Sequence, residues 1–285
     1  MRSAAMHVAP LHLPPAWADA IARLPGQGAR RIAVLGPTDV GKSSFLLALA
    51  AAWPGRERLS LVDLDPGQKL LGPLGTVSLG HAGESGLACT RFRFIGSTSA
   101  ILMRAIIGTA AELAEETPFA ANTSGFIQGP GARLQAASVA ALRADTVVAI
   151  GVAEPPLPPG WAGRLIRLDP SPHARRKSEG VRRRTRQEAF EAHLGRETLI
   201  LPPLPFEPGP PRLLEGERRP LCCLADAAGE DMLVGVLEDF GPDGVRIRAA
   251  APPRPPTLVR LGRIWAKPVD GGWRLLDRLE PAWTG

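Results

Sequence analysis

The sequence predicts an α/β protein in which a doubly wound parallel sheet is followed by a small antiparallel β domain. Between residues 29 and 205, short apolar runs typical of buried strands alternate with helical patterns. Such alternation is typical of a parallel sheet with helices on both faces. After residue 220, short β-like runs are separated by Gly, Pro and Asp turns, as in small antiparallel domains. The chain of 285 residues, 45% of them hydrophobic, is long enough for both.

Changes in composition set the expected domain boundaries. Residues 1–28 form a Pro/Ala-rich extension with a short helix opened by proline, and residues 29–205 form the alternating domain. That domain includes an arginine-rich segment at about residues 171–194. A Pro-rich linker at residues 206–220 leads to the small β domain at residues 221–285.

Charge and cysteine content narrow the class of protein. The formal net charge of +6 suits a polyanionic partner such as nucleic acid. Cys89, Cys222 and Cys223 offer neither a disulfide framework nor a metal-ligand spacing, so we expect buried thiols. We find no signal-peptide pattern and no apolar run long enough for a membrane span, and we therefore expect a soluble cytoplasmic protein that binds no membrane.

The first strand, loop and helix carry a phosphate-binding motif. Residues 30–36 read as a buried strand and residues 43–53 as a helix, and "GPTDVGKSSF" between them fits G-x-x-x-x-G-K-[ST]. This pattern predicts a P-loop NTPase domain, in which backbone N–H groups and the helix N-terminus bind phosphate oxygens. Lys42 would reach the β and γ phosphates, and the Ser43 hydroxyl would bind Mg²⁺. The residues expected to hold the nucleotide are Gly36, Thr38, Asp39, Val40, Gly41, Lys42, Ser43 and Ser44.

The second strand, at residues 58–65, ends in two acids. Asp63 and Asp65 lie at the carboxyl end of this buried strand, where open α/β sheets bind ligands, and alternation puts both on the same side. One carboxylate is enough to hold Mg²⁺, and the second is then free to act as a base. The alternative is that one of the two caps the next element.

The remaining elements place two further candidate sites. Asn122, the only asparagine in the chain, ends a strand and is followed by glycines. This suits a loop that contacts a ligand, and an Asx turn that closes the strand is an equal alternative. Further strands are expected at residues 90–96, 118–125, 146–151, 163–168 and 197–201, and helices at residues 99–116 and 132–144.

The second candidate is the arginine-rich segment. Seven basic residues lie between Arg175 and Arg186 against one acid, Glu179. Arg182 and Arg186 are four positions apart, so a helix puts them on one face. Two arginines on a mobile helix can neutralise the charge of a transferring phosphoryl group. The alternative is a solvated basic face. The N-K-x-D motif of guanine-specific proteins is absent, which argues against a signalling GTPase of the usual kind.

Taken in order, these motifs resemble those of the polynucleotide 5′-hydroxyl kinase family. Its members include the RNA kinase of the mRNA 3′-end cleavage factor and the kinase of pre-ribosomal RNA processing. "GPTDVGKSSF" is similar to the family P-loop and "DLDPGQ" to its D-x-D-x-G-Q motif. "GPLGTVSL" and "FIGSTS" follow at the expected places, "NTSGFIQG" resembles the loop called the clasp, and the arginine helix resembles the lid with its R-x-x-x-R pair. The β-like runs after residue 220 resemble the small C-terminal domain of the family.

The resemblance implies roles for individual residues. Asp65 matches the acid that activates the 5′-hydroxyl, and Asp63 matches a more variable acid that supports the metal. Arg182 and Arg186 match the lid pair, with Arg183 as a rival because the run is rich in arginine. Phe126 stands where eukaryotic members have tryptophan. Substrate contacts are expected from Gln68, Asn122, Thr123 and Phe126.

The resemblance therefore implies a kinase that uses ATP and Mg²⁺ and acts in RNA processing or repair. Its partner would be a nucleic acid with a 5′-hydroxyl end, RNA favoured over DNA, and protein partners stay unassigned. Two other classes remain open. One is a catalytically weak ATP-binding scaffold of an RNA-processing complex, and the other is a P-loop kinase that acts on a small metabolite.

Overall fold

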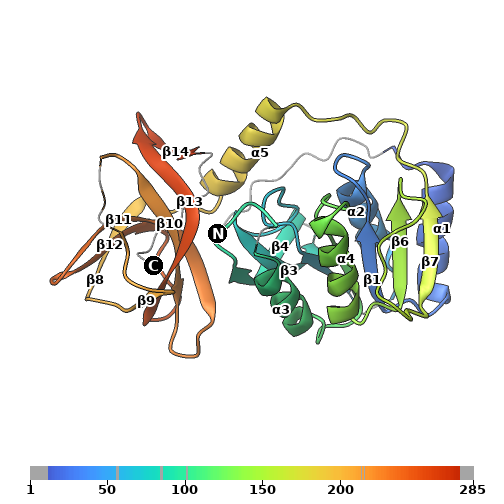
Figure 1. The fold of residues 1–285 in the computed structure, drawn as a ribbon, viewed down its shortest axis with the longest axis horizontal. Helices are drawn as coiled ribbons and strands as arrows, with labels where there is room; N and C mark the ends of the chain where they lie inside the picture. Colours follow the sequence, from blue (N-terminus) through green and yellow to red (C-terminus); the bar gives the residue numbers. More distant parts are fainter. Residues whose placement is uncertain are drawn as a thin grey trace.

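The computed structural model describes residues 12–55, 58–83, 86–100, 102–212, 214 and 216–276. Two sheets lie side by side, each with its own core, and helix α5 (Glu179–Glu191) lies over the junction between them (Figure 1). This arrangement confirms the predicted fold class. Within the described residues, no helix combines the length and the apolar character needed to cross a membrane.

The first sheet has five parallel strands in the order β2-β5-β1-β6-β7, and an antiparallel hairpin, β3–β4, extends it beyond β2. The sequence pattern predicts only the second strand of that hairpin, at residues 90–96. The sheet is parallel from β2 to β7, as predicted, and the antiparallel hairpin at its edge was not predicted. The strands are β1 (Arg31–Leu35), β2 (Ser60–Asp63), β3 (Thr76–Gly83), β4 (Gly86–Phe94), β5 (Phe119–Asn122), β6 (Thr146–Ile150) and β7 (Arg164–Leu168).

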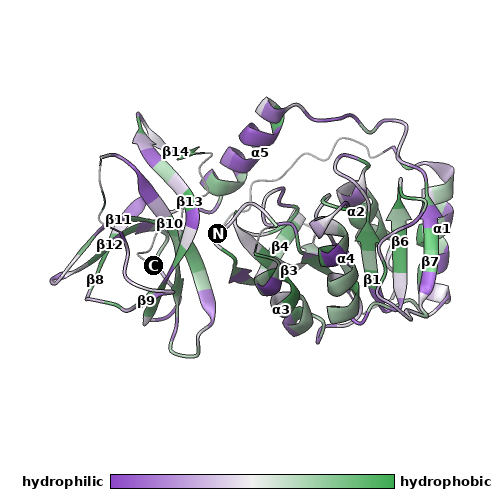
Figure 2. Ribbon diagram, in the orientation of Figure 1, coloured by the Kyte–Doolittle hydropathy of each residue, from purple (hydrophilic) through white to green (hydrophobic). Residues whose placement is uncertain are grey.

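Helices cover both faces of this sheet. Side chains of α1 (Pro15–Gly26) and α2 (Lys42–Ala52) pack on one face, and those of α3 (Met103–Leu113) and α4 (Pro130–Ala141) pack on the other. The strands between them are buried on both faces, so they read as continuous apolar runs, coloured green in β1 and β6 (Figure 2). Their carboxyl ends form the edge that carries the P-loop.

The second sheet is antiparallel in the order β14-β13-β10-β11-β12-β8, and β9 pairs in parallel with β13. Strand β8 lies in this sheet, paired with β12, although the sequence pattern places residues 197–201 in the first domain. The boundary between the two sheets therefore precedes β8, and the predicted linker contains β9 and the start of β10. The strands are β8 (Glu197–Leu201), β9 (Phe206–Glu207), β10 (Arg219–Ala225), β11 (Asp231–Gly241), β12 (Gly244–Ala249), β13 (Leu258–Val269) and β14 (Gly272–Leu276).

Strand β10 is buried on both faces, which explains the adjacent cysteines. Successive side chains of a strand point to opposite faces. Cys222 packs in the core enclosed by the second sheet, whereas Cys223 packs in a cluster that also contains Phe92 of the first sheet and Phe190 of α5. Both thiols are fully buried, as predicted, and burial raises the pKa of each, so they are inert packing groups.

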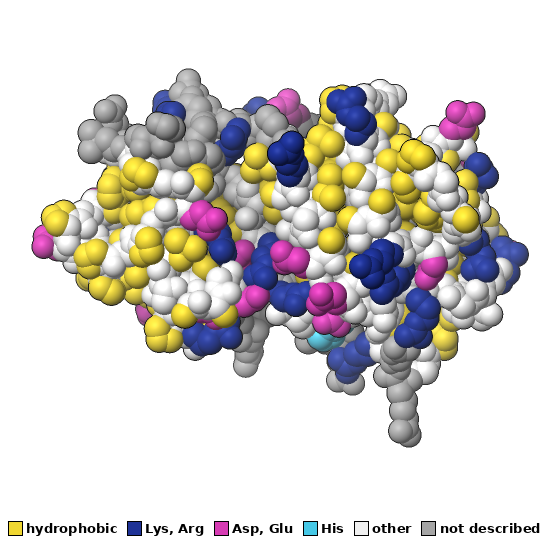
Figure 3. All heavy atoms as spheres, turned by 60° about the horizontal axis from the view of Figure 1, so that its bottom comes forward, with side chains coloured by type: hydrophobic (Ala, Val, Ile, Leu, Met, Phe, Trp, Pro, Cys, Tyr) yellow, Lys and Arg dark blue, Asp and Glu magenta, His cyan; other side chains and the backbone are white. Residues whose placement is uncertain are grey.

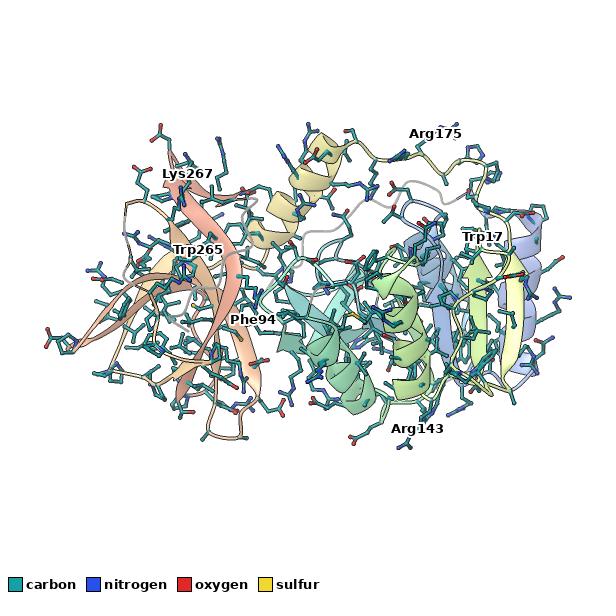
Figure 4. The ribbon with its side chains drawn as sticks, viewed as in Figure 1. Trp17, Phe94, Arg143, Arg175, Trp265 and Lys267 are labelled. Carbon is teal, nitrogen blue, oxygen red and sulfur yellow. The ribbon has the colours of Figure 1, made fainter. Side chains whose placement is uncertain are left out.

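Polar contacts join the two parts at the same junction. The Arg93 guanidinium makes a two-pronged ion pair with Glu230, both contacts 2.8 Å long, and the backbone N–H of Phe94 donates to Asp231 at 2.7 Å. Phe94, the last residue of β4, lies where the two parts meet (Figure 4). Acidic and basic side chains are mixed along the surface there (Figure 3). Because a bidentate pair and an apolar cluster both cross the junction, the two parts form one packed unit.

Candidate nucleotide and phosphate-transfer site

The predicted P-loop joins β1 to α2 at the carboxyl edge of the first sheet. A Cβ on Gly36 would lie 2.4 Å from the carbonyl oxygen of Ile150, and one on Gly41 would lie 2.6 Å from the ring of Trp17. Gly41 also has a φ of 101°, which L side chains rarely adopt. Both motif glycines are therefore required by close approach, and the loop backbone is held between β6 and α1.

Trp17 ties the N-terminal helix to this loop. Its indole packs edge-on against Phe45 of α2, with ring centroids 5.6 Å apart, and its Nε1 donates to the carbonyl of Asp169 at 2.9 Å. The side chain extends from α1 and is 1% exposed (Figure 4). The helix predicted in the N-terminal extension is thus part of the wall of the P-loop.

Lys42 is buried and points back along the loop. Its Nζ donates to the carbonyl oxygens of Gly36 and Pro37, each at 2.8 Å. Burial lowers the pKa of Lys42 to about 8, and the nearby carboxylates of Asp65 and Asp39 oppose this shift. The lysine is therefore an ammonium group with poor solvation, which an anionic phosphate would stabilise.

Asp63 occupies the end of β2 and has all its acceptor capacity filled. It is fully buried, forms an ion pair with Lys69 at 2.9 Å, and accepts further hydrogen bonds at both oxygens. Those donors are the backbone N–H groups of Asp65, Leu70 and Leu71 and the Nδ2 of Asn122. A carboxylate offers about four lone-pair sites. This geometry argues against the predicted magnesium role of Asp63 and assigns it instead to holding the loop that follows β2.

Asp65 keeps a carboxylate oxygen available. Its Oδ1 accepts from the backbone N–H groups of Gly67 and Gln68, both at 2.9 Å, and its Oδ2 accepts no hydrogen bond from the part of the chain that the structure describes. Burial, together with the negative charge of Asp63, raises the pKa of Asp65 above its usual value. Among the residues that the structure describes, the Gln68 side chain bonds only to the carbonyl of Gly67, at 3.3 Å.

Oxygen ligands suitable for Mg²⁺ are thus found at Asp65 and at Ser43, which is exposed in the first turn of α2. Mg²⁺ prefers hard oxygen donors and keeps several waters, so a carboxylate and a hydroxyl beside a phosphate-binding loop fit it. The donor set of Asp65 and Ser43 is compatible with the metal, whereas that of Asp63 is not.

The loop after β5 contains both anchors and an exposed ring. Asn122 is 3% exposed and bonds Asp63 at 2.9 Å, and Thr123 is 1% exposed and donates to the carbonyl of Val34 at 2.9 Å. The sequence analysis expects substrate contacts from both side chains, but their burial leaves neither of them open to a long substrate. Phe126 is 46% exposed, and it is the predicted substrate residue of this loop that a base could reach.

Two residues that the sequence analysis missed hold this loop in place. The Gln135 amide donates to Ser124 and to the carbonyl of Phe126, at 2.9–3.1 Å. A Cβ on Gly125 would lie 2.5 Å from the backbone nitrogen of Thr38, so the loop touches the P-loop. A polar residue on the buried side of a helix was the signal available for Gln135, which is 1% exposed.

The arginine segment forms α5, capped by Ser178, whose hydroxyl accepts from the N–H of Val181. Arg182 reaches the P-loop, where its Nη2 pairs with Asp39 Oδ2 at 2.5 Å. Arg183 instead pairs with Glu179 on the exposed side of the helix, at 2.8 Å. Arg183, the alternative to the lid pair in the sequence analysis, thus lies on the side of the helix away from the P-loop. Arg186 follows Arg182 by one helical turn.

Comparison with known proteins now identifies the family. Residues 36–194 match the family model described as the mRNA cleavage and polyadenylation factor CLP1 P-loop. The chain belongs to this family. The order of the motifs in the sequence predicted that membership, which is confirmed.

Relatives with curated names fall in the same group. The chain is 28% identical to the polyribonucleotide 5′-hydroxyl-kinase of Pyrococcus furiosus over 184 residues, which cover 60% of this chain and 52% of that protein. A second match, to the polyribonucleotide 5′-hydroxyl-kinase of Pyrococcus horikoshii, is 25% identical and covers 59% and 51%. The polynucleotide 5′-hydroxyl-kinase grc3 of Neosartorya fischeri is 37% identical over 87 residues, 26% of this chain and 10% of that protein. The chain matches about half the length of the Pyrococcus relatives.

Solved structures share the fold. Clp1p in its complex with Pcf11p superposes with a TM-score of 0.68 at 11% identity, covering 89% of this chain and 80% of Clp1p. At this identity the likeness shows the fold, which is that of the P-loop domain together with its neighbouring β domain.

Proposed function

We propose that this chain is an ATP-dependent polynucleotide 5′-hydroxyl kinase that transfers the γ-phosphate of ATP to the 5′-hydroxyl end of RNA in preference to DNA. One observation carries the proposal: a basic and an acidic residue of the P-loop, an acid after β2 and a lid arginine interact at one edge of the sheet. The charges of Asp65 and Asp39 act on Lys42 and oppose the lowering of its pKa, and Asp39 forms an ion pair with Arg182. A group-transfer site needs this set, because it combines a base with cations for the phosphoryl charge. The curated names of the relatives support the choice of acceptor.

The triphosphate binds along the P-loop. Backbone N–H groups between Gly36 and Lys42 and those at the N-terminus of α2 donate to its phosphate oxygens, with Ser44 in the first turn. Lys42 leaves the carbonyls of Gly36 and Pro37 and donates to the phosphate oxygens, since a charged acceptor is a stronger partner than a neutral carbonyl. The pKa of Lys42 then rises from about 8.

Asp65 acts as the base. Its Oδ2 takes the proton of the 5′-hydroxyl as the hydroxyl oxygen forms its bond to the γ-phosphorus, and the bond from that phosphorus to the bridging oxygen breaks, releasing ADP. The raised pKa of Asp65 makes the carboxylate a better proton acceptor near neutral pH. Arg182 and Arg186 spread the charge of the loose transition state.

Ser43 would hold Mg²⁺, which would supply neutralisation of charge on the phosphate oxygens, and Asp65 is kept for the role of the base. Asp63 serves this site indirectly. It holds the N–H of Asp65 and the amide of Asn122, and so fixes the backbone on which the base is carried.

The polynucleotide would lie across Phe126 and the basic surface of the lid. An exposed phenyl ring is a stacking platform for a base. The arginine segment supplies cations for backbone phosphates, and Arg175 lies on the stretch that leads to α5 (Figure 4). Binding should therefore weaken as salt rises.

Transfer of labelled γ-phosphate from ATP tests the proposal. The acceptors are a 5′-hydroxyl RNA oligonucleotide and its DNA counterpart, with Lys42→Ala as control. We expect more label on the RNA than on the DNA. The rate of transfer should fall by about 10²-fold or more in Asp65→Asn, and by about 10³-fold or more in Arg182→Ala. Unchanged turnover in both variants would refute the site assignment.

Competition separates the remaining classes. Oligonucleotides, and not mononucleotides, should compete with the labelled acceptor. Competition by mononucleotides alone would indicate a metabolite kinase. ATP binding without transfer to any acceptor would indicate a scaffold.

A further inference from the structure

We propose that Asp39 of the P-loop is a positioning residue, which docks the arginine lid on the loop and sets the place of Arg182 before phosphate transfer. This inference rests on the proposed function and deepens it, because it gives a lid-positioning role to a side chain within the phosphate-binding motif itself. The residue acts through Arg182 and not by contact with the acceptor.

Two contacts from the lid segment converge on one oxygen of Asp39. Arg182 Nη2 lies 2.5 Å from Oδ2, and the backbone N–H of Lys177, just before α5, donates to the same oxygen at 2.9 Å. The Asp39 side chain is 10% exposed and that of Arg182 is 21% exposed, so water screens the pair only in part. Asp39 therefore holds both the helix and the chain that enters it.

The backbone at Asp39 is shaped for this task. Its φ of 65° is in the left-handed region, which aspartate and asparagine occupy more readily than other residues with side chains. The carboxylate also faces Lys42, whose pKa it helps to raise. Asp39 is thus placed between the phosphate-binding lysine and the lid arginine.

The far half of α5 is held by the second sheet. Gln187 donates to the carbonyl of Trp273 at 2.6 Å and accepts from the N–H of Leu275 at 2.9 Å, and Phe190 is buried in the cluster at the junction. Asp39 therefore positions the N-terminal half of α5, and the second sheet holds its C-terminal half. Arg182 donates to Asp39 through Nη2, and its other side-chain N–H groups make no hydrogen bond within the described residues, so they can face an incoming phosphate.

Hydrogen–deuterium exchange across residues 172–186 tests the docking without any assay of activity. The variants are Asp39→Asn, Arg182→Ala and the double variant. Asparagine tolerates the positive φ and keeps an acceptor for the Lys177 amide, so it isolates the ion pair. Glu179→Gln is the matched control, because it removes the exposed ion pair with Arg183 on the same helix.

We expect Asp39→Asn and Arg182→Ala to accelerate exchange of the segment by about tenfold each, and the double variant to show no more than Arg182→Ala alone. Glu179→Gln should leave exchange as in the wild type. Unchanged exchange in Asp39→Asn, or effects that add in the double variant, would overturn the docking role.

Kinetics then separate positioning from a structural role. With the oligonucleotide acceptor, Asp39→Asn should lower kcat by about tenfold while KM for ATP changes by less than about threefold. In the Arg182→Ala background the same substitution should have no further effect on kcat. An unchanged kcat in Asp39→Asn would overturn the positioning role even where exchange increases.

Failure of the proposed function has a different signature. If the wild type phosphorylates no oligonucleotide but the exchange cycle shows the coupling, the choice of acceptor is wrong and the docking of the lid by Asp39 stands.

Discussion

Replacing Lys69 by methionine should destabilise the protein strongly, although Lys69 lies outside the P-loop. Its side chain is 2% exposed, and its Nζ contacts Asp63 at 2.9 Å and the carbonyl of Thr76 at 3.0 Å. Methionine has a similar length but no charge, so the fully buried Asp63 would lose its counter-ion. Removal of one partner of a buried ion pair costs about 3–5 kcal/mol.

The hydrogen bonds that remain around Asp63 favour a cost near the lower end of this range of about 3–5 kcal/mol. Four donors stay with the carboxylate after the change: three backbone N–H groups and the amide of Asn122. Hydrogen bonds to a charged group are worth about 1.5–3 kcal/mol each and keep part of the solvation. We therefore expect a loss of about 3 kcal/mol, or a fall in Tm of about 6–12 °C for a chain of this size.

Urea denaturation of Lys69→Met measures the loss, with the m-value compared to show that the exposed surface is unchanged. Lys267→Met is the matched control, since Lys267 is only partly buried, and its cost should stay within about 0.5 kcal/mol. The double variant Asp63→Asn/Lys69→Met, which removes both charges, should lose less than the sum of the two single changes. A loss below about 1 kcal/mol for Lys69→Met would refute the assignment of Asp63 and Lys69 as a buried pair.

Four further predictions concern the site. Lysine ¹³Cε NMR should show Lys42, identified by its absence from Lys42→Arg, titrating at about 8 and not at 10.5. Because burial penalises its charged form, stability should rise with pH between those two values, and a titration at 10.5 would contradict the burial argument. Asp65 must be ionised to act as the base, and its pKa is raised above the usual aspartate value of 3.8. In a pH–rate profile, kcat/KM should therefore fall on the acid side at a pH above 3.8. A fall at or below pH 3.8 would exclude Asp65 as the base. Phe126→Ala should weaken oligonucleotide binding by about 1–3 kcal/mol through lost stacking, as seen in fluorescence anisotropy, with ATP affinity unchanged. Gly125→Ala should lower ATP affinity in calorimetry, because the new Cβ would press on the backbone of Thr38; wild-type affinity would show that the loop yields.

The sequence predicts the central sheet well because its strands are buried on both faces and because the P-loop motif marks where the first strand ends and the next helix begins. The run at residues 30–36, the glycines and the helix that follows occur as expected. The hairpin at the sheet edge is harder to predict. Strand β3 follows a glycine- and proline-rich segment, and its short polar and small residues give no clear apolar run.

The pairing of strands is a second feature that the sequence does not predict. The run at residues 197–201 is correctly predicted as a strand, but periodicity says nothing of which sheet a strand joins. Its pairing with β12 depends on chain geometry after α5. The same limit applies to the linker at residues 206–220, where the two residues of β9 pair with β13.

In the site, the sequence locates the motifs on their strands and helices but gives no sign of their long-range partners. Asp63 and Asp65 were found from their place at the end of a strand, but the choice between them depends on Lys69, which folds back from six positions beyond Asp63. The burial of Asn122 depends on the same carboxylate. Asp39 gave no signal beyond its place in the motif, because its partner is 143 positions away.

The anchoring of α5 by the second sheet also bears on the entropy of the reaction. A free helix of 13 residues, about 20 Å long, would lose much orientational freedom on closing over a phosphate. With Gln187 and Phe190 already fixed, most of that loss occurs when the protein folds and not during each turnover. In the proposed reaction, the β domain thus raises the effective concentration of Arg182 at the phosphates, and loosening its hold on α5 should make the activation entropy of transfer less favourable.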